Sequence, residues 1–303
     1  MAATGRMTSP PGGGAPDVSV VLPAFNRAGS LREAMDSVLA QEGPTLELIV
    51  VDDGSADTTA EVAAAHPDPR VRLIRLESNR GATVARNTGI AAARAPWVAF
   101  QDSDDVWLPG KLAAQCARTG PPEVVAVYCA MRIEDPDGVS RAGSRILPGP
   151  GVRLREGKIL PSLLRDSFVS TQTLMVRRDV LERLGGFDPA LPALQDWELM
   201  LRVAGAGTVA FVPDPLVVQR FSANSLTRVR ARRAAARAAI LARHGALFAT
   251  DPMALALHHY RVAGDARALG RPDEARAALS RASRAAPWWW RPYAMRLWLA
   301  LRR

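Results

Sequence analysis

Hydrophobic and polar positions in the first hundred residues alternate between short apolar runs and longer segments with helical periodicity. The apolar runs have the length and β-branched character of buried strands, and they lie at residues 18–22, 46–51, 71–76 and 97–101. Between them, Ser30 with Glu33 and Thr58 with Glu61 have the spacing of capping boxes. Residues 81–94 read as a further helix. The alternation predicts an α/β domain with a mostly parallel sheet covered by helices.

Polar residues follow three of these runs, where a parallel sheet exposes the carboxyl ends of its strands. Asn26 follows the first run, Asp53 the second, and the segment Asp-Ser-Asp-Asp at 102–105 the fourth. Ligands of open α/β sheets bind at this edge. Three carboxylates in four residues repel one another, so a divalent cation that also binds phosphate is a natural partner. Alone, such a segment is more often a turn or a helix cap.

Five ordered motifs resemble the family 2 inverting glycosyltransferases, which have the GT-A fold and use nucleotide-diphosphate sugars. They are Val-Val-Leu-Pro-Ala-Phe-Asn-Arg at 20–27, Val-Val-Asp-Asp-Gly-Ser at 50–55, Asn-Arg-Gly-Ala at 79–82, Ala-Arg-Asn-Thr-Gly-Ile at 85–90 and Asp-Ser-Asp-Asp at 102–105. Gly-Gly-Phe-Asp at 185–188 and Gln-Asp-Trp-Glu-Leu at 195–199 extend the likeness. The resemblance implies a GT-A domain over residues 17–228, with a nucleotide-binding half at 17–105 and an acceptor half at 106–228.

The resemblance and the residue chemistry together assign a nucleotide site. Pro23 and Ala24 are expected to form its backbone wall, and Phe25 either stacks on the base or packs in the core. Asp53 is expected to accept a hydrogen bond from a uracil imide or a ribose hydroxyl. Asp52 either helps in this or only caps its loop.

Charged residues are expected to hold the diphosphate and its metal ion. Arg86 and Arg27 are the candidates for the diphosphate, with surface solvation as the alternative for Arg27. The resemblance gives Asp104 a direct contact with Mg²⁺ or Mn²⁺, and gives Asp102 a contact with the metal or the ribose. Asp105 is expected to cap the segment that follows.

The resemblance assigns the general base, which deprotonates the attacking acceptor hydroxyl, to Asp196. A plain helix-start residue is the alternative for Asp196, and Glu198 is the second candidate for the base. Two positions depart from the family pattern. Gln195 replaces a Glu, which removes one like charge that would raise the pKa of Asp196. Ser222 replaces a His of the metal–diphosphate site and is a weaker ligand.

Composition and charge add a second region. The chain has 303 residues and a net charge of +9. Its basic excess lies in an Ala-, Leu- and Arg-rich region at 229–303, which is predicted to be helical. Residues 268–282 resemble the middle of one tetratricopeptide repeat, and a single repeat must pack on something else. No recognised module accompanies the positive charge, so nucleic acid is not an expected partner.

Tryptophans near the end of the chain allow two interpretations. Trp288 to Trp290 and Trp298 lie among arginines, which suits an anionic membrane interface, whereas the alternative is the core of a small helical cap. No apolar run approaches the length of a transmembrane helix. The Gly- and Pro-rich residues 1–16 are expected to be a disordered arm without a signal peptide. With only Cys116 and Cys129 as cysteines, the expected location is cytoplasmic, with peripheral contact at the inner face of the membrane.

The sequence therefore predicts an inverting glycosyltransferase. It would move a sugar, with a UDP-linked donor expected, to a hydroxyl of a glycan or lipid-linked acceptor in polysaccharide, glycolipid or other cell-envelope glycan synthesis. Two alternatives stay open. Gln195, Ser222 and the repeat-like region allow a catalytically weakened scaffold that binds nucleotide sugars. A nucleotidyltransferase can share the nucleotide-binding fold, although no Gly-rich phosphate loop with Arg and Lys follows the first run.

Overall fold

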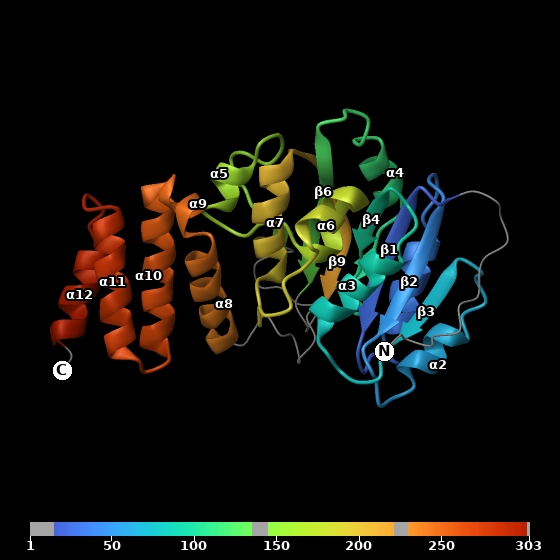
Figure 1. Cartoon of the computed structure of the whole chain (residues 1–303), viewed down its shortest axis with the longest axis horizontal. Helices are drawn as coiled ribbons and strands as arrows, with labels where there is room; N and C mark the ends of the chain where they lie inside the picture. Colours follow the sequence, from blue (N-terminus) through green and yellow to red (C-terminus); the bar gives the residue numbers. More distant parts are fainter. Residues whose placement is uncertain (1–14, 135–144, 221–229, 302–303) are drawn as a thin grey trace.

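A computed structural model describes residues 15–134, 145–220 and 230–301 of the chain. Within these ranges, one mixed nine-stranded sheet is covered by helices on both faces, and a row of helices extends from one side (Figure 1). Most of the predicted disordered arm, and Ser222, lie outside the described residues.

The sheet joins a parallel half to a half with mixed strand directions. Its strands are β1 (Val18–Ala24), β2 (Leu46–Asp52), β3 (Val71–Arg75), β4 (Trp97–Phe100), β5 (Val106–Trp107), β6 (Val124–Glu134), β7 (Arg145–Leu147), β8 (Leu174–Arg177) and β9 (Thr208–Arg220). Their order is β3-β2-β1-β4-β8-β6-β9-β5, with β7 paired to β6. The first four strands are parallel, as the sequence predicts. Strand β8 is antiparallel to both β4 and β6, so the sheet as a whole is mixed.

Helices pack on the two faces because the strands are apolar on both sides. The helices that precede the C-terminal region are α1 (Leu31–Leu39), α2 (Thr59–Ala64), α3 (Ala82–Ala92), α4 (Lys111–Cys116), α5 (Leu160–Leu163), α6 (Arg178–Leu184) and α7 (Gln195–Ala206), with a 3₁₀ turn at Thr171–Thr173. Val20 and Leu22 pack in the cluster that includes α1. Val21, between them, packs in the cluster that includes α3, α6 and α7. Successive strand residues thus face opposite layers.

The two predicted capping boxes are wrong, although the helices begin where expected. Neither Ser30 nor Thr58 makes a side-chain cap hydrogen bond. The Ser30 hydroxyl instead donates to the carbonyl of Ser103 at 2.7 Å. Glu33 pairs with Arg220 at 2.6 Å. In the first of the two boxes, tertiary partners therefore bind the side chains that the local pattern assigned to the helix end.

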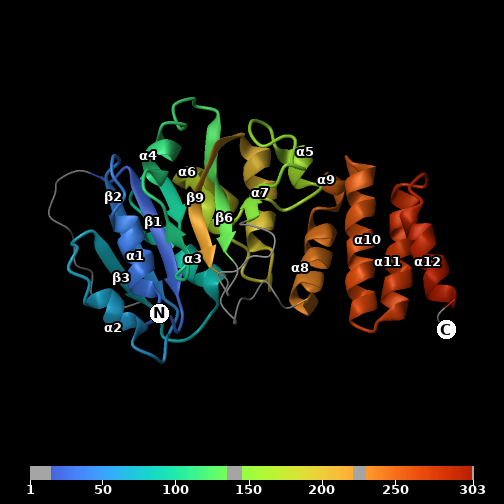
Figure 2. The ribbon, with the colours of Figure 1, turned by 180° about the vertical axis from the view of Figure 1, so that it is seen from behind.

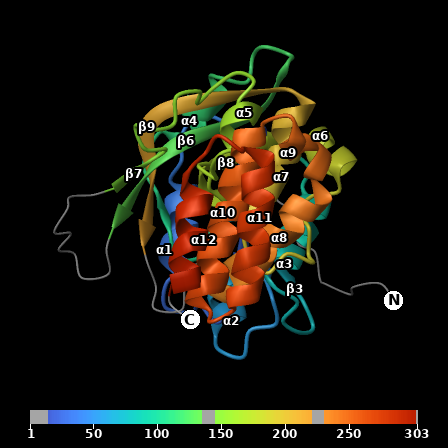
Figure 3. The ribbon, with the colours of Figure 1, turned by 90° about the vertical axis from the view of Figure 1, so that its left-hand side faces the viewer.

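The C-terminal region is helical, as predicted. It comprises α8 (Arg230–Arg243), α9 (Gly245–Ala249), α10 (Pro252–Ala268), α11 (Pro272–Ala285) and α12 (Arg291–Leu301). Figures 2 and 3 show α8, α10, α11 and α12 packed side by side, with α12 farthest from the sheet. Ala236, Ile240 and Phe248 belong to the same hydrophobic cluster as α3 and α7. Helices α11 and α12 share a separate small cluster with α10. The predicted domain boundary at residue 228 lies outside the described residues and stays a prediction.

Candidate active site

Three loops meet at the carboxyl ends of β2, β1 and β4, which are neighbours in the sheet. Backbone N–H groups of the loop after β1 donate hydrogen bonds to side chains that follow β2. Asn26 N–H donates to the Ser55 hydroxyl at 2.9 Å, and Arg27 N–H donates to the Thr59 hydroxyl at 2.8 Å. The Arg27 side chain reaches the loop after β4, where its guanidinium lies 3.5 Å from Asp104. The convergence expected from the strand pattern is therefore present.

Two arginines hold the predicted carboxylate pair. Arg86 Nη2 lies 2.6 Å from Asp102 Oδ1, and Arg27 Nη2 lies 3.5 Å from Asp104 Oδ2. Arg86 is buried, and Arg27 is half-buried, so surface solvation does not describe Arg27. The side chains of Asp102 and Asp104 keep 26% and 30% of their surface exposed. Positive and negative groups thus stand together at an accessible edge, where a diphosphate and a cation would need them.

Asp53 and Asp52 are both buried, but their carboxylates bind different groups. Both oxygens of Asp53 accept backbone N–H groups, from Arg80 at 2.8 Å and from Gly81 at 2.7 Å, which fastens the β2 loop to the start of α3. Asp52 is buried, accepts the Ser55 N–H at 3.2 Å and lies 3.2 Å from Arg75. For Asp52 this matches the loop-capping interpretation. A nucleotide contact by Asp53 stays a prediction; its oxygens retain further lone pairs for it.

The residues predicted to form the wall of the nucleotide site differ in their exposure. Pro23 and Ala24 are buried at the end of β1, paired with Val51 and Asp52. Phe25 is 40% exposed, so it is not a core residue and its ring is available for stacking.

Asp105 does not cap the following segment, contrary to the expectation. It is buried, and its carboxylate accepts the backbone N–H of Arg220 at 3.0 Å, at the end of β9. Burial, together with the neighbouring charges of Asp102 and Asp104, raises the pKa of Asp105 to about 9. The residue ties the acidic loop to the opposite part of the sheet.

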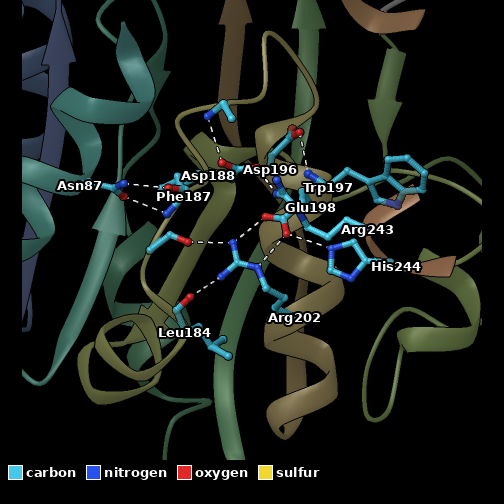
Figure 4. Close-up of polar contacts among 12 residues, drawn as sticks. Asn87, Leu184, Phe187, Asp188, Asp196, Trp197, Glu198, Arg202, Arg243 and His244 are labelled. Carbon is cyan, nitrogen blue, oxygen red and sulfur yellow. Dashed lines mark hydrogen bonds and ion pairs between the residues drawn. The ribbon is translucent and has the colours of Figure 1, made fainter. Parts of the chain in front are cut away.

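Asn87 binds the Gly-Gly-Phe-Asp segment to the nucleotide half. Asn87 Nδ2 donates to the Phe187 carbonyl at 2.8 Å, and Phe187 N–H donates to Asn87 Oδ1 at 2.8 Å (Figure 4). Gly186 has φ of +67°, and a Cβ there would lie 2.5 Å from Asn87 Oδ1. The Arg86 guanidinium also lies 5.5 Å from the centre of the Phe187 ring. Asn87 was not among the predicted site residues, although the Ala-Arg-Asn motif contains it.

Asp196 lies in the first turn of α7, just after a strained residue. Leu194 has φ of +58°, which is unusual for a residue with a side chain. The Asp196 carboxylate is half-buried and accepts the N–H of Trp197 at 2.8 Å. Burial raises the pKa of Asp196, and the charge of Arg86 partly opposes this while that of Asp102 adds to it. Asp196 follows the Gly-Gly-Phe-Asp segment, which Asn87 binds to the nucleotide half. Its pKa is raised even though Gln195 carries no charge.

Glu198, the second candidate for the base, is buried and already engaged. Its two oxygens lie 2.9 Å and 2.6 Å from Nε and Nη2 of Arg202, and Oε1 lies 3.0 Å from Nε2 of His244. Arg202 also donates to the carbonyls of Leu184 and Gly186 (Figure 4). These contacts make Glu198 an anchor of α7 and leave Asp196 as the accessible carboxylate of this turn.

The partly exposed carboxylates of Asp102 and Asp104 are the candidate ligands of a divalent metal. Among the residues that the structure describes, no group of three or more Asp, Glu, His or Cys side chains could by itself hold a metal ion. Mg²⁺ commonly binds through one or two carboxylates together with phosphate oxygens and water. The partly exposed pair is suited to this shared mode of binding.

Comparison with known proteins identifies the class. The sequence profile described as Glycosyl transferase family 2 matches residues 19–185. The succinoglycan biosynthesis protein ExoO of Rhizobium meliloti (strain 1021) is 36% identical over 228 residues, which are 71% of this chain and 63% of ExoO. An uncharacterized glycosyltransferase of Rickettsia prowazekii (strain Madrid E), RP339, is 30% identical over 216 residues, 70% of this chain and 66% of that protein. The chain thus spans slightly less than two thirds of these relatives.

Solved structures share the fold. The mannosyltransferase PcManGT from Pyrobaculum calidifontis, in complex with GDP-Man and Mn²⁺, superposes with a TM-score of 0.62 at 24% identity, covering 98% of this chain and 84% of that one. Residues 1–349 of S. aureus TarS, in complex with UDP-GlcNAc, give a TM-score of 0.66 at 18% identity, covering 89% and 81%. The fold and the profile match define a glycosyltransferase with the GT-A fold. The chain belongs to glycosyl transferase family 2.

Proposed function

We propose that this glycosyltransferase inverts the anomeric centre of a nucleotide-diphosphate sugar, with UDP as the expected nucleotide. The supporting observation is that the segment leading to Asp196 is bound to the candidate diphosphate site. Asn87 hydrogen-bonds the backbone of Phe187, and the Arg86 guanidinium lies 5.5 Å from the centre of the Phe187 ring. In a one-step reaction, the acceptor hydroxyl attacks the anomeric carbon from the face opposite the leaving diphosphate. That attack forms the new glycosidic bond, breaks the bond to the diphosphate and inverts the centre.

The residues divide this work. Asp196 takes the proton of the acceptor hydroxyl. Arg86 and Arg27, which pair with Asp102 and Asp104 in the structure, exchange these partners in part for diphosphate oxygens. Asp102 and Asp104 would hold Mg²⁺ or Mn²⁺, which neutralises charge on the leaving diphosphate.

We assign recognition of the base to the end of β1 and to the loops after β1 and β2, which lie beside this charged site. Phe25 stacks on the base above the backbone of Pro23 and Ala24, and Asp53 accepts a hydrogen bond from the base or the ribose. The exposure of the Phe25 ring supports its part in this assignment.

The acceptor is proposed to be a hydroxyl of a glycan or a lipid-linked sugar in cell-envelope glycan synthesis. The similarity to ExoO, a succinoglycan biosynthesis protein, supports this class of acceptor for the present chain. Membership of the family favours transfer over the nucleotidyltransferase alternative. A catalytically weakened scaffold would bind a nucleotide sugar without turning it over.

A panel of UDP- and GDP-sugars tests the sugar donor. The donor that binds in the presence of Mn²⁺ should raise the melting temperature, because it binds only the native state. Release of its nucleotide separates an enzyme from the scaffold alternative. Asp104→Asn should abolish the metal-dependent part of the shift, whereas Leu154→Ala, an exposed change on the acceptor half, should not. An undiminished shift in Asp104→Asn would refute the metal assignment.

Asp196→Asn tests the base. Loss of a general base costs about 10² to 10⁴ in rate, and binding of the nucleotide sugar should be nearly unchanged. Such a split marks a group that acts in the transition state. The control is Gln195→Glu, which restores the usual family pair and should be tolerated. If Asp196→Asn keeps near-normal transfer, the base lies elsewhere.

The exposed aromatic face of the C-terminal region supports contact with an anionic membrane. We define the aromatic face as Trp288, Trp290, Tyr293, Leu297 and Trp298, of which the first two are 72% and 67% exposed. Trp289 differs, because its ring packs 5.1 Å from that of Tyr260, as the helical-cap interpretation expects. Within the described part of the chain, no helix combines the length and the apolar character needed to cross a bilayer. Attachment would therefore be through this face.

Co-sedimentation with vesicles tests the attachment. The protein should bind vesicles that contain phosphatidylglycerol at low salt and release them at high salt, because salt screens exposed charges. Each basic group near such a surface contributes about 1 kcal/mol, and Arg291 and Arg296 lie in α12 beside the aromatic face. Trp288→Ala with Trp290→Ala should weaken binding, and Leu154→Ala should not. Equal binding by the double variant would refute the role of the face.

A further inference from the structure

The residues directly after Asp196 are held by the C-terminal helices. The ring of Trp197 is buried, and its Nε1–H donates to the Leu163 carbonyl at 2.7 Å. Its outer side is covered from the tail. The Phe248 ring lies 5.9 Å away, the His258 ring 4.8 Å away and the Arg237 guanidinium 5.6 Å away. Helices α8, α9 and α10 thus each place one group against this indole.

Glu198 is bound from the same direction. His244, between α8 and α9, places Nε2 3.0 Å from Glu198 Oε1, while Arg202 on α7 binds both Glu198 oxygens. Arg202 continues the chain of contacts to the carbonyls of Leu184 and Gly186. Figure 4 shows these groups on one side of α7, linking the tail to the loop after α6.

A second contact from the tail holds the loop that leads to Asp196. Arg243 forms an ion pair with Asp188, and the other oxygen of Asp188 accepts the Ala190 N–H at 3.0 Å. Asp188 follows Phe187, which Asn87 fixes to the nucleotide half. The tail therefore contacts both ends of the segment that includes the strained Leu194.

We propose that helices α8 to α10 are positioning elements of the active site, with His244 and Arg243 as positioning residues that set the carboxylate of Asp196 through Glu198 and Asp188. This inference rests on the proposed role of Asp196 as the base. Trp197 and Glu198 follow Asp196 in one helical turn, so a shift of their side chains tilts that turn. A displacement of about 1 Å at a reacting group can cost about 10² in rate. Helices α8 to α10 are then not separable from catalysis, whereas α11 and α12 make no contact of this kind among the described residues.

His244→Ala and His244→Gln form the decisive pair of variants. Alanine removes the contact with Glu198, whereas the Gln amide restores an N–H donor near the position of Nε2. Turnover is measured as nucleotide release from the sugar nucleotide selected in the panel, and UDP with Mn²⁺ is the binding probe. In His244→Ala, kcat should fall about ten- to a hundredfold with an unchanged KM for the sugar nucleotide and an unchanged thermal shift by UDP. His244→Gln should recover most of the rate.

The control variant is Arg276→Ala, which removes an exposed ion pair with Asp273 on α11 and should leave turnover within about twofold. In the Asp196→Asn background, His244→Ala should have no further effect, because coupled residues are not additive. Wild-type kcat in His244→Ala, or equal loss of rate and UDP binding, overturns the positioning role in favour of a passive or merely structural contact. If Asp196→Asn retains activity, the proposed base fails instead, and that result is read independently of His244.

Discussion

His258 makes the stability of the C-terminal packing depend on pH. Its ring is fully buried, with Nε2 2.8 Å from the Leu164 carbonyl and Nδ1 3.0 Å from Nη1 of Arg237. A carbonyl accepts and a guanidinium donates, so the ring must be neutral with its proton on Nε2. Burial, together with the charge of Arg237 and smaller effects of the same sign from Arg261 and His259, lowers the pKa of His258 to about 3.

The magnitude follows from linkage between protonation and folding. The unfolded chain binds a proton at His258 below about pH 6.5, whereas the folded chain does not until about pH 3. Stability therefore rises with pH across this window and is lost as the pH falls through it. The loss is about 1.4 kcal/mol per pH unit, so lowering the pH from 7 to 5 should lower the free energy of unfolding by about 2 kcal/mol.

Denaturant unfolding of the wild type and of His258→Gln at pH 7 and pH 5 measures this term. Glutamine does not titrate and keeps an N–H donor for the Leu164 carbonyl. Acidic groups with lowered pKa values, such as Asp68, contribute equally to both proteins and cancel in the comparison. The wild type should lose about 2 kcal/mol more than the variant. Equal losses in the two proteins would show that His258 is not held neutral in the fold.

Three further outcomes are expected. Glu47→Ala leaves the buried Arg72, now 2.6 Å from that carboxylate, without its partner, and should cost about 3–5 kcal/mol in a urea titration. Gly89→Ala places a Cβ 2.3 Å from Val21 Cγ1 in the core, and should destabilise by about 1–3 kcal/mol in thermal unfolding, with unchanged stability refuting the close packing. The proposed base Asp196 must be ionised to act, and burial raises its pKa. As the pH is lowered, kcat should therefore begin to fall at a higher pH than the value near about 4 of an ordinary Asp, and a fall only below that value would contradict the assignment.

Local patterns were sufficient for the elements of the nucleotide half. The four apolar runs became β1 to β4, and the parallel order of these strands brought the Asp-rich loop, Asp53 and the residues after β1 to one edge. Runs of apolar residues predict such strands because burial depends on the character of neighbouring side chains. The composition of residues 229–303 likewise predicted that the C-terminal region is helical. The same local logic failed at Ser30, whose hydroxyl bonds to Ser103 instead of capping its helix.

What only the tertiary structure decided is the partner of each polar side chain. Asn87 binds Phe187, Asp105 binds the backbone of Arg220, and His244 binds Glu198 across large separations in sequence. Such pairs depend on sheet order and on the docking of helices, and no periodicity in the chain encodes them. The sequence by itself determined which residues are the candidates for the chemistry of sugar transfer. The fold determined that the tail is packed behind the helix of Asp196, because burying the apolar face of α8 to α10 required the surface of α7.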